Sequence, residues 1–89
     1  MFQNVVIGKP IYDARLLIAY DKDDWEEHEK KNTLFTETRF LPAIMKESGI
    51  VKSTGEVRRN KPELCITLDK LDCLNIKWGK KFLYIVVGE

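Results

Sequence analysis

The densest run of basic side chains in the chain is SGIVKSTGEVRRNKPEL, residues 48–64. Ser53 and Glu56 have the spacing of a capping box, which predicts that a helix begins after Ser53. A helix N-terminus offers free N–H groups and a partial positive charge, and both suit a phosphate. Further charge-assisted hydrogen bonds would come from the basic residues Lys52, Arg58 and Arg59. The run therefore indicates phosphate binding, although an ordinary capped helix whose charges face water fits the same residues.

A second basic group surrounds a tryptophan in KWGKK, residues 77–81. An exposed aromatic ring beside lysines can stack on a nucleic-acid base. The alternative is that Trp78 packs on the neighbouring strand. Together the two basic groups predict a nucleic-acid-binding site made of Lys52, Ser53, Arg58, Arg59, Lys77, Trp78, Lys80 and Lys81.

Residues that usually carry catalysis or hold a metal ion are sparse. His28 is the only histidine and stands among acids, while Cys65 and Cys73 are the only cysteines. Their spacing matches no zinc site, and the chain has no glycine-rich phosphate loop between a strand and a helix. We therefore expect no catalytic residue, no metal and no cofactor, and we expect both cysteines to stay reduced.

A short helix is predicted to lead into the first basic run. Apolar residues recur at helical spacing from Leu41 to Met45 and continue to Ser48. Pro42 fits only the first turn of such a helix, because a proline further in would clash and remove a hydrogen bond. Gly49 is well placed to end it.

A second helix follows Ser53 and is predicted to end near Asn60, because Pro62 disfavours helical angles at the residue before it. Gly79 then marks the turn of a hairpin. The strands predicted after the second helix cover residues 63–69, 74–78 and 82–87, and the last of them is expected to be central in its sheet because it is apolar on both faces.

The N-terminal half of the chain is predicted to contain a strand pair and an acidic helix. Residues 2–7 and 14–20 have strand-like composition and would form a hairpin. Asp23 and Glu26 have capping-box spacing, so a surface helix is expected over residues 24–31. The stretch DKDDWEEHE, residues 21–29, has six acids and one lysine, a net charge of −5.

Length and composition indicate one globular domain, residues 1–89, with 44% hydrophobic and 33% charged residues. The predicted fold class is α+β: a helix-turn-helix unit packed on a small, mostly antiparallel sheet, with an N-terminal strand pair and an acidic surface helix. No apolar run approaches the roughly 20 residues that span a bilayer. Without such a span or a secretory signal, we expect no membrane partner and a cytoplasmic location.

The stretch IMKESGIVKSTGEVRR resembles the alpha-L RNA-binding motif, and WGKKFLYIVV resembles the closing hairpin of one of its versions. The motif occurs in a ribosomal small-subunit protein and in the C-terminal domain of bacterial tyrosyl-tRNA synthetases. Its glycine, apolar pair, serine, glutamate and two arginines match this chain from Gly49 to Arg59 without a gap. The resemblance covers residues 39–61 and 74–87, whereas the family has a glycine where Leu64 stands. It implies that RNA phosphates are bound by the second helix and the hairpin.

These observations favour a non-catalytic nucleic-acid-binding module whose partner is structured RNA ahead of DNA. One alternative is a winged helix-turn-helix regulator, with the helix after Ser53 in the DNA major groove and the hairpin at Lys80 and Lys81 as the wing. Another is a small protein-binding regulator or phage-type inhibitor without nucleic-acid affinity, whose partner would contact the acidic segment 21–29. That segment would also weaken nucleic-acid binding if it covered the basic residues.

Overall fold

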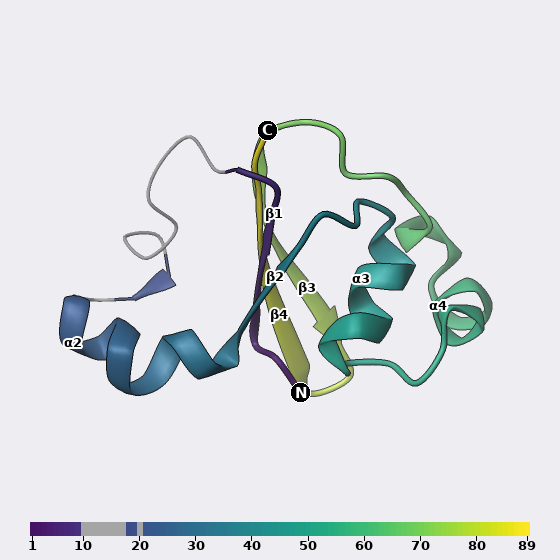
Figure 1. The fold of residues 1–89 in the computed structure, drawn as a ribbon. Helices are drawn as coiled ribbons and strands as arrows, with labels where there is room; N and C mark the ends of the chain where they lie inside the picture. The colour runs from purple at the N-terminus through teal and green to yellow at the C-terminus, as the bar shows by residue number, and fades with distance from the viewer. Residues whose placement is uncertain (10–17, 20) are drawn as a thin grey trace.

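The structure is a computed structural model that describes residues 1–9, 18–19 and 21–89 (Figure 1). At its centre is a four-stranded sheet in the order β2-β1-β4-β3. Helices lie on both sides of this sheet, which confirms the predicted α+β class. The strands are β1 (Asn4–Ile7), β2 (Thr33–Thr36), β3 (Asp72–Trp78) and β4 (Lys81–Val87).

The sheet is mixed, so the prediction that it is mostly antiparallel is wrong. β1 runs parallel to both β2 and β4, and only β3 and β4 are antiparallel. A helical segment lies between β1 and β2, and such a crossover returns the chain to the same end of the sheet and produces parallel pairing. Because β1 is paired on both edges, it has no edge left for the predicted hairpin with residues 14–20, most of which lie outside the described residues.

One face of the sheet is covered by α3 (Leu41–Ser48) and α4 (Thr54–Asn60), which lie together on the right of Figure 1. α3 has its proline in the first turn and ends at Gly49, whose φ of 87° is left-handed, as predicted. α4 is capped by Ser53 and ends at Asn60, also as predicted. These two helices and the short turn between them are the unit expected from the sequence.

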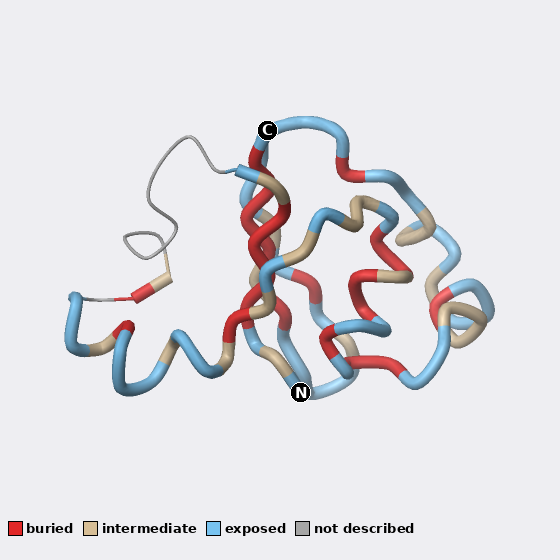
Figure 2. The backbone as a smooth tube through the Cα atoms, viewed as in Figure 1, coloured by how far each residue is buried: buried red, intermediate tan, exposed pale blue. Residues whose placement is uncertain are grey.

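The main core lies between these helices and the sheet, where Figure 2 shows the buried residues gathered. Alternate residues of the central strands point toward α3 and α4, so that Val5 and Ile7 of β1 pack with Ile85 of β4. The predicted central position of residues 82–87 is confirmed, because β4 lies between β1 and β3.

The strand predicted over residues 63–69 is not formed. Pro62 instead begins a short 3-10 helix, η3 (Pro62–Leu64). Beyond it only Thr67 makes a bridge, to Phe40, with backbone hydrogen bonds on either side. The single bridge forms because this stretch meets only the short segment that enters α3, rather than an extended strand.

The opposite face of the sheet is partly covered by a continuous helical segment made of α2 (Lys22–Asp24), the π-helix η1 (Trp25–Glu29) and the 3-10 helix η2 (Lys30–Asn32). The helix was predicted, but its cap is Asp21 rather than Asp23: Asp21 Oδ1 accepts a hydrogen bond from the Asp24 N–H at 2.8 Å. Trp25 is only 5% exposed, and its ring meets that of Phe35 edge-on with centroids 6.3 Å apart. The helix is therefore acidic on its outer side and anchored by an aromatic pair on its inner side.

Candidate nucleic-acid interface

The two arginines predicted to bind phosphate project from α4 into solvent. Val57, the residue before them, is completely buried in the core and fixes the rotation of the helix. Successive helical residues are about 100° apart, so Arg58 and Arg59 are both exposed but point in different directions. The Arg59 guanidinium lies back over Gly55, where an added Cβ would come within 3.2 Å of its nitrogen.

The N-terminus of α4 is not free to receive a phosphate. Ser53 Oγ accepts a hydrogen bond from the Glu56 N–H at 3.3 Å, and Glu56 Oε2 accepts one from the Lys52 N–H at 3.1 Å. Both halves of the predicted capping box are thus engaged, although the carboxylate reaches Lys52 rather than Ser53. The Glu56 carboxylate also places a negative charge where the phosphate was expected, so Ser53 acts as a helix cap in this structure.

Lys61, which was not among the predicted site residues, joins α4 to the hairpin. Its Nζ donates a hydrogen bond to the Lys77 carbonyl oxygen at 3.0 Å and lies 5.6 Å from the centroid of the Trp78 ring. Lys61 is the first residue beyond α4, where its N–H donates a hydrogen bond to the Val57 carbonyl oxygen at 2.8 Å. No sequence spacing indicated its place in the site, because Lys61 meets Trp78 and Lys77 only through the fold.

Trp78 is half-buried and packs against the main core as well as under Lys61. The alternative that Trp78 packs within the domain is thus supported, whereas base stacking stays a prediction. We call Lys52, Arg58, Arg59, Lys61 and Trp78 the α4 surface.

The hairpin lysines do not all join this surface. β3 alternates as predicted, with Ile76 and Trp78 toward the core and Lys77 on the opposite face. The Lys77 Nζ lies 5.8 Å from the centroid of the Phe82 ring, across the strand pair. Lys80 and Lys81 line a pocket that is formed mainly by residues of that same opposite face. The expected single basic surface is therefore divided into two by the sheet.

The acidic segment 21–29 does not cover the α4 surface. It lies on the other side of the sheet, as Figure 1 shows for α2 on the left and α4 on the right. On that side of the sheet Lys30 Nζ lies 3.7 Å from Glu26 Oε2, and His28 Nε2 lies 3.8 Å from Glu27 Oε2. The basic groups of the α4 surface are thus left without a carboxylate partner among residues 1–9, 18–19 and 21–89.

The histidine, the cysteines and the acidic side chains that the structure describes are not gathered into one site. His28 is exposed, both cysteines are free thiols, and no three described His, Cys, Asp or Glu side chains gather closely enough to hold a metal ion. Among the described residues, no helix combines the length and apolar character that crossing a membrane requires.

The two helices and the closing hairpin that carry the alpha-L resemblance are all present in the fold, whereas the family relationship itself stays a prediction from the motif. Comparison of the chain with protein-family models, with curated proteins and with solved structures gives no match.

Proposed function

We propose that this domain is a non-catalytic nucleic-acid-binding module that binds structured RNA through the α4 surface. The observation that supports this most directly is the state of Arg58 and Arg59, which are both exposed and have no carboxylate partner among the described residues. The separation of the acidic segment onto the far side of the sheet supports it further, because that segment does not repel a ligand at α4 from close range.

The arginines are suited to phosphate by their chemistry. A guanidinium presents a planar fork of donors that matches two phosphate oxygens, and it stays charged at all relevant pH values. Because Arg58 and Arg59 diverge, they would contact phosphates on different parts of the backbone rather than one phosphate together. Lys61 is held between Lys77 and Trp78, so it offers a positioned cation beside them.

RNA is favoured over a duplex DNA site by the shape of this region. α4 has seven residues, which corresponds to about 10 Å of helix and is short for reading several base pairs in a major groove. Lys80, the expected tip of a wing, lies by the pocket on the other face rather than beside α4. Contacts to RNA backbone and to unpaired bases require less regular geometry.

The test is a fluorescence-anisotropy titration of a labelled structured RNA and a labelled DNA duplex at several salt concentrations. The double variant Arg58→Ala/Arg59→Ala should bind the RNA at least about ten-fold more weakly. The slope of log K against log salt concentration should become shallower by roughly 0.7 for each phosphate contact that is lost. The matched control is Lys22→Ala/Lys31→Ala, which removes the same charge from exposed positions on the acidic side.

Three results would contradict the proposal. Equal affinity of the arginine variant and the control would move binding away from the α4 surface. Tighter binding of the duplex than of the RNA would favour the DNA-binding alternative. No binding of either nucleic acid at moderate salt would leave a protein partner as the function to pursue.

A further inference from the structure

The face of the sheet opposite α3 and α4 is covered over only half its width. Near β1, Val6 and Val86 are buried with Ile18 packed against them. Toward β3 the cover ends, and Phe82, the second residue of β4 after the hairpin turn, is 59% exposed. A large aromatic ring left open on a sheet face beside cations differs from a scattered surface apolar residue, and it indicates a binding surface.

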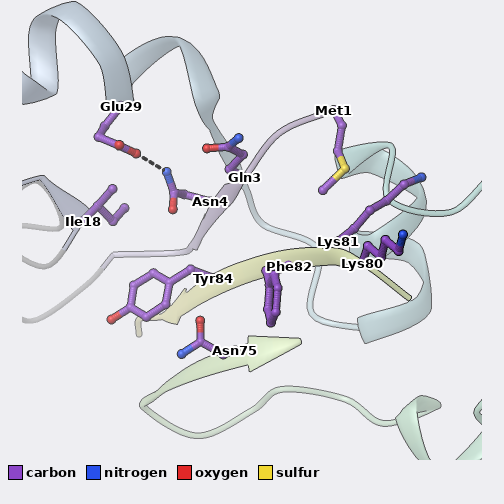
Figure 3. A pocket seen from close by; sticks show the side chains of 10 residues that line it. All are labelled: Met1, Gln3, Asn4, Ile18, Glu29, Asn75, Lys80, Lys81, Phe82 and Tyr84. Atoms are coloured by element: carbon purple, nitrogen blue, oxygen red, sulfur yellow. Dashed lines mark hydrogen bonds between the residues drawn. The ribbon is translucent and has the colours of Figure 1, made fainter. Parts of the chain in front are cut away.

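A pocket of about 610 Å³ opens beside this ring (Figure 3). Lys80 and Lys81 lie toward one end of it, and Phe82 lies between them and the other end. At that other end Glu29 is held by a hydrogen bond of 2.8 Å from Asn4 Nδ2. The pocket thus has a cationic end, an aromatic centre and a polar end with hydrogen-bonding groups.

We propose that this pocket holds one nucleotide unit of a single-stranded RNA segment, with the base against Phe82 and its phosphate at Lys80 and Lys81. The inference rests on the proposed function, since it assigns a second contact region to the same ligand. It goes beyond that function by placing the region on the opposite face of the sheet and by making it specific for unpaired nucleotides.

The order of groups along the pocket determines the direction of the nucleotide. A phosphate is attracted to the two lysines and repelled by the Glu29 carboxylate, so it belongs at the lysine end. The base then lies over Phe82, where stacking is favourable for any base, with its edge toward Asn4 and Glu29. Lys77, with its Nζ 5.8 Å from the Phe82 ring centroid, adds a further positive charge beside the stack.

The neighbouring ring on β4 is also suited to contact with a base. Tyr84 is half-buried, and the pKa of its phenol is raised, first by burial and then by its hydrogen bond and charge interaction with Cys73. The phenol therefore stays neutral near pH 7, and the ring presents no negative charge to the RNA. A nucleic acid is favoured over a protein segment because three lysines surround the aromatic centre and the main opposing carboxylate already accepts a hydrogen bond.

The two contact regions are close enough for one RNA to reach both. The Lys77 carbonyl accepts the hydrogen bond from Lys61 of the α4 surface, while the Lys77 side chain lies on the pocket face. A strand that leaves the α4 surface therefore has only the β3–β4 hairpin to cross before it meets Phe82. We expect structured RNA with an unpaired overhang to engage both regions.

The test compares a labelled single-stranded oligouridine, a labelled hairpin RNA without overhang, and the mononucleotide UMP. Phe82→Leu keeps an apolar side chain but removes the stacking ring, and it should weaken oligouridine binding about ten-fold. Phe82→Trp should restore it, and Lys80→Ala/Lys81→Ala should weaken it with a reduced salt dependence. The matched control is Phe35→Leu, another exposed aromatic on the same face but on the far edge strand, β2. UMP should bind much more weakly than the oligonucleotide.

The results separate this inference from the proposed function. If Phe82→Leu binds oligouridine as well as the original chain does, the pocket assignment is overturned, whereas loss of hairpin binding in Arg58→Ala/Arg59→Ala would still support the α4 surface. If UMP binds as tightly as the oligonucleotide, the site is one for a free nucleotide and the strand assignment is wrong. Thermal unfolding of each variant shows that it is folded, so a loss of affinity reports on contact.

Discussion

The two faces of one sheet differ in what lies on them. The face toward α3 and α4 is a closed core, with Val5, Ile7 and Ile85 fully buried. The other face is closed near β1 and open near β3, where Phe82 and Lys77 meet water. The same strands form both faces, and alternation along β4 separates stability from binding: Leu83, Ile85 and Val87 pack in the main core, whereas Phe82 on the other face remains available to a ligand.

The strongest test of this division is a pair of alanine substitutions on β4. Ile85→Ala should reduce the free energy of unfolding by about 2–5 kcal/mol, because it opens a cavity in the closed core. Phe82→Ala should reduce it by less than about 1 kcal/mol, because the ring is mostly in water. Urea unfolding followed by tryptophan fluorescence measures both. Similar losses for the two variants would mean that the open face is part of the core.

A smaller effect is expected at the cap of α4, where stability and binding can be separated. Ser53→Ala removes the acceptor of the Glu56 N–H and should reduce the free energy of unfolding by about 1 kcal/mol. Because the serine is a cap rather than a phosphate ligand, RNA affinity should stay unchanged at temperatures where the variant is fully folded. Ser53→Asp should keep the cap and the stability. If folded Ser53→Ala binds RNA more weakly than the original chain does, Ser53 contacts the RNA and is not only a helix cap.

Removing the negative charge of Glu56 is expected to increase RNA affinity slightly. Glu56→Gln keeps an oxygen that can accept the Lys52 N–H but removes a negative charge from the α4 surface. RNA affinity should rise a few-fold, which is under about 1 kcal/mol. Glu27→Gln, at an exposed position on the far side of the sheet, is the matched control and should change affinity less. If both variants gain the same RNA affinity, the effect depends on the net charge of the domain and not on the position of Glu56.

The smallest predicted effect concerns Tyr84 on the open face. A raised pKa means that the native state resists ionisation of the phenol more than the unfolded state does. The stability contribution is therefore complete below about pH 10, the ordinary tyrosine value, and is lost as pH rises through the higher native pKa. Tyr84→Phe should lose less stability than the original chain over this range. Identical alkaline profiles would show that burial and the Cys73 hydrogen bond do not affect the phenol.

Local features of the fold were predictable because single residues specify them. Pro42 and Gly49 bound α3, Ser53 begins α4, and Gly79, with a φ of 63°, turns the hairpin. Which strands pair with one another was not predictable in the same way. β2 has only four residues, which is too few for a clear alternation, and its parallel pairing with β1 depends on residues far away in the chain.

The candidate site was predictable in its composition more than in its arrangement. The arginines of α4 are exposed as expected, but Lys61 became part of the surface only through its contact with Trp78. The alternation of β3 already places Lys77 and Trp78 on opposite faces of the sheet, so the two side chains do not belong to one surface. The Glu56 carboxylate at the helix N-terminus shows why a cap pattern alone is weak support for a phosphate site, since the same glutamate completes the cap and repels the ligand.

The position of β4 between β1 and β3 has a consequence for how the chain is made. β1 is synthesised first but needs residues 33–36 on one edge and residues 84–87 on the other. A nascent chain that stops before residue 81 would have β1 with an open edge and would lack Leu83, Ile85 and Val87 of the main core. Folding on the ribosome should therefore be delayed until the last strand has left the exit tunnel, which makes the nascent chain a candidate substrate for chaperones.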